Sequence, residues 1–147
     1  MKIIEALLGE HGAFYAQFAH LEQAIPAAED AAQIREQAAL LAAALGSHAN
    51  LENELLFAAL DPHLGPMGPL AVMRMEHDEI ESALTGAQEA ENAEEVRTLL
   101  TRVIRVAREH FAKEERVLFP MALQVLDAET LDRLGEQWAS RRGVTLS

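Results

Sequence analysis

The sequence contains no cysteine, which excludes disulfides, thiolate metal sites and a cysteine nucleophile. Proline and glycine are also scarce, with five and eight residues, and three prolines and two glycines fall together in residues 61–69. Runs of β-branched residues are few while alanine is abundant, a composition that favours helix over sheet. No apolar run approaches the roughly 18 residues of a membrane helix, so we expect no membrane span.

Basic residues are few as well: 12 stand against 24 acidic ones, for a formal net charge of −12. Such a surface repels phosphate backbones and anionic lipids, so we expect no nucleic-acid partner and no membrane partner. The first residues, MKIIEALLGEHG, hold too short an apolar run for a signal peptide, and Glu5 interrupts it. We therefore expect a cytoplasmic protein whose residues 1–147 form a single domain.

Helical spacing of apolar residues predicts four long helices, over about 3–25, 28–60, 70–90 and 92–125. Residues 61–69 form the predicted loop. Because short connections make neighbouring helices antiparallel, the predicted fold is all-α: an up-down-up-down four-helix bundle over about 3–125 with a short C-terminal fifth helix over about 128–140.

Some details of these helices follow from single residues. Asn92, with Glu95 three residues later, and Asp127 are the expected N-caps of the fourth and fifth helices. Trp138 is expected to pack the fifth helix onto the bundle, and Pro120 to kink the end of the fourth helix. The inward-facing stripes are expected to include Leu8, Val117 and Met121.

Histidine and glutamate interrupt the apolar stripes in their inward register. Residues i and i+4 of a helix differ by about 40° in direction, so each His-x-x-x-Glu pair faces one neighbour. Three helices carry such a pair and the first carries a lone histidine, which would bring them together midway along a bundle. The residues are His11, His48, Glu52, His77, Glu81, His110 and Glu114.

Three carboxylates buried together need a counter-charge, because uncompensated burial costs many kcal/mol or forces protonation. Two divalent or trivalent cations supply it, and four imidazoles with three carboxylates suit iron, and manganese or zinc less distinctively. The alternative is a metal-free helical interaction domain in which each pair is ordinary surface pairing. His20, about 180° round the helix from His11, and His63, in the predicted loop, are expected to be solvated.

A phrase of His, three residues, Glu, three residues and Leu-Phe occurs twice, in HANLENELLFA (48–58) and HFAKEERVLFP (110–120). A Glu-His pair opens each half, at residues 10–11 and 76–77. The first two helices therefore look like a pseudo-duplicate of the next two, and their metals would lie about a local two-fold axis.

The repeat is broken where Tyr15 takes the place of Glu81. Tyr15 lies one turn from His11 and is a candidate proton donor or iron ligand; the alternative is a core residue whose hydroxyl is bonded elsewhere. Four glutamates beside the ligands point about 100° away and are expected to be solvated, or at most to bind imidazole N–H groups. They are Glu10, Glu76, Glu109 and Glu115.

These motifs, His11, HANLE (48–52), EHDEIE (76–81) and HFAKEERVLFP (110–120), resemble the hemerythrin-like, or HHE cation-binding, family over about residues 3–125. The resemblance implies a four-helix bundle around a non-haem di-iron centre bridged by an oxo or hydroxo group. It also assigns the ligands: one iron takes His77, Glu81 and His110, the other takes His11 and His48, and Glu52 and Glu114 bridge them. The second iron is short of protein ligands, which leaves a position for a diatomic or peroxide.

The oxygen-carrying hemerythrins differ from this chain at two places. They have a histidine where this chain has Glu81, and their last helix spaces histidine and bridging aspartate five apart, whereas His110 and Glu114 are four apart. An anionic ligand should stabilise ferric iron, which argues against simple oxygen transport. The chain resembles instead the His/Glu-rich branch, known for iron sensing, peroxide handling and oxidation chemistry.

Two functions follow from this interpretation. One is a di-iron protein that binds or reacts with O2, peroxide or nitric oxide, for example as a catalase-like enzyme. The other is a non-catalytic iron or oxygen sensing or storage module whose fold depends on its metal. Repair of iron–sulfur clusters fits less well, because the related repair proteins have an extra cysteine-bearing domain and a histidine at position 81. The fifth helix would either cap a monomer or mediate a dimer, and the sequence does not identify a protein partner.

Overall fold

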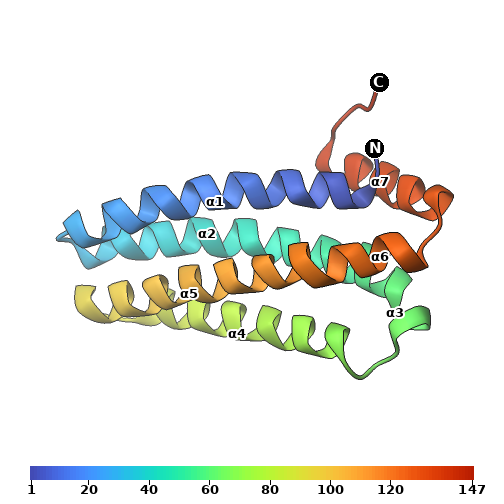
Figure 1. Ribbon diagram of the computed structural model, residues 1–147. Coiled ribbons are helices and arrows are strands. Elements are labelled where there is room, and N and C mark those ends of the chain that lie inside the picture. Colours follow the sequence, from blue (N-terminus) through green and yellow to red (C-terminus); the bar gives the residue numbers. More distant parts are fainter.

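The computed structural model describes residues 1–147, and all its regular elements are helices (Figure 1). Four helical rods run antiparallel and a short fifth helix lies beside the start of the first, which confirms the predicted all-α bundle. None of the helices is long and apolar enough to span a bilayer. The elements are α1 (Ile3–Ala27), α2 (Ala31–Leu51), η1 (Glu52–Phe57), α3 (Ala58–Leu64), α4 (Pro69–Glu89), α5 (Ala93–Lys113), η2 (Glu114–Leu118), α6 (Phe119–Val125) and α7 (Ala128–Arg142).

Side-chain caps set where several helices begin. The Asn92 Oδ1 atom accepts a hydrogen bond from the Glu95 amide (2.8 Å), and Asp127 caps α7 through the Thr130 amide (2.8 Å), as predicted. Asp30 caps α2 in the same way, through the amide of Ala32 (2.9 Å). The second rod, which consists of α2, η1 and α3, therefore begins at residue 31 rather than near the predicted residue 28.

The second rod ends later than predicted. Its helix continues through Pro62 to Leu64, and the chain turns only where Gly65 and Gly68 adopt positive φ angles of 75° and 94°. Left-handed glycines end helices readily because they have no Cβ atom. His63 consequently lies in α3 rather than in a loop, although its side chain is exposed as predicted.

Two π-helical segments interrupt the long rods. The segments η1 and η2 continue α2 and α5, and their i→i+5 hydrogen bonds take up more residues per turn than an α-helix does. The inward register shifts by one residue as a result: Val117, predicted to face inward, is 53 % exposed, and Leu118 is buried instead. Leu8 was also wrongly placed; it is 42 % exposed, because the neighbouring Leu7 occupies the core-facing position.

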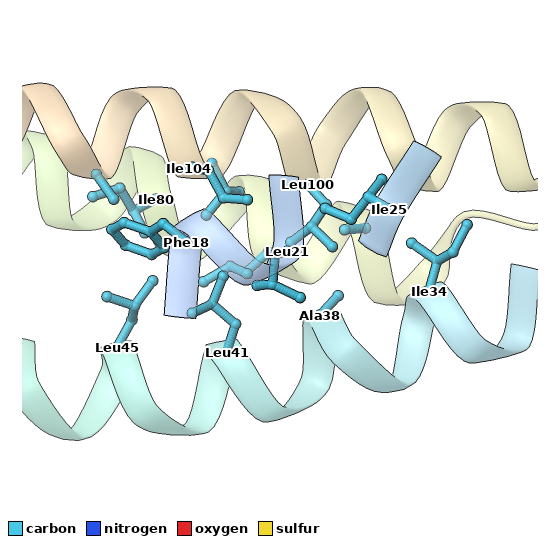
Figure 2. Packing of buried hydrophobic residues seen from close by; sticks show 14 of the residues in the cluster. Phe18, Leu21, Ile25, Ile34, Ala38, Leu41, Leu45, Ile80, Leu100 and Ile104 are labelled. Atoms are coloured by element: carbon cyan, nitrogen blue, oxygen red, sulfur yellow. The ribbon is translucent and has the colours of Figure 1, made fainter. Parts of the chain in front are cut away.

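The apolar core consists of two clusters that lie on either side of a polar layer. One includes Phe18, Leu41 and Leu100, and Figure 2 shows its side chains meeting between the rods. The other includes Leu7 and Leu56 and extends to the residues of α7. Along every long rod a histidine falls between the two clusters, so the polar layer crosses the middle of the bundle.

Candidate metal centre

Six of the seven predicted ligands converge in this polar layer and form two overlapping groups of four. Within each group, one donor atom from every residue lies within 4.8 Å of the others. Both groups contain Glu52 and Glu114, and all six side chains are buried. The first group is His11, His48, Glu52 and Glu114; the second is Glu52, His77, His110 and Glu114.

The π-helical segments begin at the two shared carboxylates. Glu52 is the first residue of η1 and Glu114 the first residue of η2. Each follows a histidine by four residues in an ordinary α-helical turn, so the pair faces the same neighbour. Single π turns inside α-helices are frequent at functional sites, and here the same distortion occurs at both equivalent positions.

Most of the inward-facing donor atoms have no hydrogen-bond partner. The unpartnered atoms are the Nε2 atoms of His11, His48 and His110, one oxygen of Glu52 and both oxygens of Glu114. An unsatisfied buried polar group costs about 1–3 kcal/mol, and more when charged, so six together are unusual in a folded core. Cations between these atoms would satisfy them, and imidazole with carboxylate is a donor set that transition metals prefer. The residues therefore fit a metal centre.

The titration of the two shared carboxylates also indicates a need for positive charge. Burial, together with the charge of Glu52, raises the pKa of Glu114 well above its usual value. Burial acts on Glu52 in the same direction, but the charge of His48 and the nearby imidazoles, including the His77 Nε2 atom 3.1 Å from Glu52 Oε1, outweigh it and hold that pKa well below normal. Without a cation, burial and the neighbouring negative charge therefore favour the protonated form of Glu114.

The outward-facing Nδ1 atoms of the four histidines all have partners. His48 donates to Glu10 (2.7 Å) and His110 donates to Glu76 (3.0 Å). Such bonds hold the Nδ1–H tautomer and turn Nε2 toward the site. Each glutamate lies on the neighbouring rod of the same half, immediately before the ligand of that rod. In each Glu-His pair, the histidine is therefore a candidate ligand, and the glutamate accepts a hydrogen bond from the histidine on the next rod.

The other two Nδ1 atoms bind residues of the opposite half. His11 donates to Glu115 (3.1 Å) and His77 donates to the side-chain oxygen of Asn53 (3.2 Å), each partner immediately following a shared carboxylate. Of the two alternatives expected for these glutamates, those at positions 10, 76 and 115 bind imidazole N–H groups, while the one at position 109 is exposed. Helical phase correctly directs their backbone positions away from the centre, but does not anticipate side chains that reach across to another rod.

The residues of this layer occur within a known family. The model of the hemerythrin HHE cation-binding domain matches residues 2–122, which contain all six converging side chains. The chain belongs to this family. Searches of curated proteins and of solved structures gave no match. Family membership and geometry together support metal binding by this hemerythrin domain, and α7 lies beyond the matched residues.

The Leu-Phe end of the doubled phrase has a structural role in the hemerythrin domain. Phe57 stacks on His77, with ring centroids 5.4 Å apart and an interplanar angle of 13°. Phe119 lies in the corresponding position on His11, at 5.5 Å and 26°. Each copy of the phrase thus supplies a ligand, a shared carboxylate and a ring that packs on the first histidine of the other half.

Tyr15 directs its hydroxyl to a residue beside the centre. It donates to Glu115 at 2.5 Å, and burial together with this bond raises the pKa of the phenol. The same carboxylate oxygen accepts from His11, so Tyr15 is connected to that ligand through Glu115. This arrangement agrees with the alternative that the hydroxyl is bonded elsewhere; a catalytic role for Tyr15 stays a prediction.

Glu81 is the seventh predicted ligand and lies outside both groups. Its side chain is exposed, one turn along α4 from His77. Glu81 lines a cavity that also reaches His77, so ligation by Glu81 stays a prediction that requires a turn of this side chain. His20 is exposed, as predicted.

This cavity connects the metal centre of the hemerythrin domain with the surface. It has a volume of about 290 Å³, is lined mainly by α2 and α4, and reaches three of the candidate ligands, His48, His77 and His110. Its walls combine apolar side chains such as Leu84 with polar ones that include Asp78 and Glu81.

Proposed function

We propose that this hemerythrin domain holds two iron ions per chain and that the pair binds or reacts with a small oxidant: O2, peroxide or nitric oxide. One ion would be held by His77 and His110 with Glu81, the other by His11 and His48. The two remaining ligands, Glu52 and Glu114, would be shared. Manganese or zinc would be substitutes at the same positions.

The observation that carries the proposal is that two four-donor groups share both of their carboxylates. A single cation would leave two histidines of one group unbound, whereas two cations use every donor. The mixture of imidazole and carboxylate suits iron better than calcium or magnesium, which prefer oxygen ligands alone.

An iron pair supplies redox-active Lewis-acid chemistry to a small oxidant. The chain itself sets the conditions for that chemistry. Glu10 and Glu76 hold protons on the outward nitrogens of His48 and His110, which leaves Nε2 free toward the centre. The stacked rings of Phe57 and Phe119 and the two apolar clusters exclude water from the remaining sides.

The direct test is to add hydrogen peroxide to ferrous-loaded protein and to measure the O2 that is released with an oxygen electrode. Catalase-like activity predicts O2 evolution proportional to bound iron and absent in a metal-free Glu52→Ala variant. A loaded protein that neither consumes peroxide, reduces O2 nor binds nitric oxide would exclude the proposed reactivity.

The cavity is the proposed route for the oxidant. Asp78 and Glu81 in its wall disfavour anions, so the route suits uncharged small molecules. Gly46 lines the cavity on α2, and a Cβ atom built there meets no atom within 4 Å. A larger side chain therefore has room to enter the passage without displacing the backbone.

Gly46→Leu is expected to slow the reaction with peroxide about tenfold or more while leaving metal content unchanged, because it narrows the passage without touching a ligand. Stopped-flow rates of the loaded protein measure this effect. Gly12→Leu is the matched control: Gly12 is an exposed helical glycine of α1 with equally open surroundings. Equal rates in both variants would mean that the oxidant enters elsewhere.

Glu81→Ala is expected to lower iron content from two ions to one, because Glu81 would serve only the ion held by His77 and His110. Elemental analysis of the loaded variant measures this loss. Retention of both ions with an unchanged absorption spectrum would show that Glu81 stays at the cavity wall and is not a ligand.

A second function is favoured by the position of the ligand layer between the two apolar clusters. Because the unpartnered donors lie at the middle of the core, metal occupancy would control the stability of the whole bundle. A sensing or storage module of this kind would show metal-dependent folding without peroxide turnover, which the oxygen-electrode experiment distinguishes.

A further inference from the structure

The C-terminal helix α7 is docked tightly although it lies outside the residues that match the family model. Figure 1 shows it beside the N-terminal part of α1, the rod that carries Glu10 and His11. A Cβ atom at Gly135 would lie 1.8 Å from the carbonyl oxygen of Met1, so glycine permits this close approach. Leu131 and Leu134 bury their side chains in the cluster on that side of the metal centre.

Two side chains of α7 reach the carboxylate of Glu10. Trp138 donates its indole N–H to Glu10 Oε2 at 2.7 Å. Arg142 donates from Nε to the same oxygen at 2.8 Å and from Nη2 to Oε1 at 3.0 Å. Arg142 also binds the hydroxyl of Ser47, immediately before His48.

With the bond from His48 Nδ1, the Glu10 carboxylate accepts four hydrogen bonds, about its full capacity. Glu10 is only 15 % exposed, and Arg142 is 26 % exposed. A carboxylate held at both oxygens by a planar guanidinium and an indole has one orientation, because each donor fixes a separate direction.

In the second half of the repeat, the glutamate that binds the ligand histidine has a different cationic partner. Glu76, which accepts from His110, also accepts from Lys113 at 2.5 Å, and that lysine lies three residues after the ligand on the same helix. Three residues after His48 the chain has Leu51, which is buried and apolar. The first half therefore lacks a local cation, and α7 provides it from the end of the chain.

We infer that α7 is a clamp on the metal centre in which Trp138 and Arg142 are positioning residues that fix His48 through Glu10. The inference rests on the metal-binding role proposed above for His48. Removal of the two donors would free the Glu10 carboxylate and let the imidazole turn, weakening the ion held by His11 and His48. The ion on the His77 and His110 side would be unaffected, because Glu76 has its own partner.

The test combines Trp138→Phe, which keeps a large ring but removes the N–H donor, with Arg142→Gln. Arg141→Gln is the matched control, because Arg141 is on the same turn of α7 but pairs with Glu54 instead of Glu10. Anaerobic release of ferrous iron to a chelator is expected to show one phase accelerated about 10–100-fold in the double variant. The other phase, and both phases of the control, should keep wild-type rates, and Arg142→Lys should restore part of the loss.

A second measurement keeps the inference separate from the proposed iron chemistry. In the metal-free protein, the Nδ1–H proton of His48 is expected to give a slowly exchanging downfield NMR signal that the double variant loses and the control retains. If wild-type protein binds no iron, the di-iron proposal fails, but this signal still shows whether Trp138 and Arg142 fix His48 through Glu10. An unchanged signal, or unchanged release phases in a folded double variant, would show that α7 only packs against the bundle.

Discussion

Replacing Glu52 or Glu114 by alanine is expected to remove both metal ions rather than one. Each carboxylate belongs to both four-donor groups, so each group falls from four donors to three. The remaining shared carboxylate is then the only bridge between two cations, and repulsion between the cations increases in a buried site. Elemental analysis after anaerobic loading is expected to find almost no bound iron in either variant. Glu52→Gln and Glu114→Gln should behave alike while preserving side-chain volume.

Two histidines outside the polar layer provide the controls. His20→Ala and His63→Ala change exposed residues and are expected to leave metal content at the wild-type value. If Glu52→Ala kept two irons with an unchanged spectrum, Glu52 would not be shared between the ions. Loss of iron from either control variant would show that the ligands have been assigned incorrectly.

Removal of the metal is expected to lower the thermal midpoint of unfolding by about 10 °C or more. At a metal concentration of a thousand times Kd, each site adds about 4 kcal/mol of stability by linkage. In a chain of this size, one kcal/mol corresponds to roughly 2–4 °C in Tm. The unpartnered donors provide the structural reason, because water that enters the metal-free layer relieves only part of their cost.

Calorimetry of chelator-treated and reloaded protein measures this difference. The Glu52→Ala variant supplies the comparison, since its midpoint should no longer respond to added metal. Equal midpoints for the treated and reloaded wild-type protein would contradict a structural contribution of the metal and would also exclude the sensing alternative.

Much of the fold could be predicted because the relevant signals are local. Asn92 and Asp127 are caps whose side chains bond amides three residues away, so their spacing is visible in the sequence. His48 with Glu52, and His110 with Glu114, stand four residues apart in the inward register, and four-residue spacing holds up to the point where each π segment begins.

Beyond that point, periodicity fails for a physical reason. A π turn contains one residue more than an α turn. The α-helical spacing of three and four residues that predicts Val117 to face inward is therefore wrong by one residue, and Leu118 is buried instead. The consecutive apolar residues at 55–57 (three) and 118–119 (two) were a signal of this change, because successive residues of an α-helix point in directions about 100° apart.

The partners of the ligands could not be predicted from helical phase alone. Glu10 and Glu115 leave their helices in outward directions and reach a histidine on a different rod. Such contacts depend on which rods are neighbours and on how far they are apart. The repeat offered one hint, since a glutamate precedes the first histidine in both halves, and a duplicated polar residue of unknown purpose is a candidate partner for a ligand.

The most direct test of the central claim is the number of metal ions per chain, measured by elemental analysis after anaerobic purification and loading with ferrous iron. Two shared carboxylates between two pairs of histidines predict two irons per chain, lost together in Glu52→Ala. A folded protein that binds no iron would contradict the metal centre, and one that binds a single ion would contradict the shared role of Glu52 and Glu114.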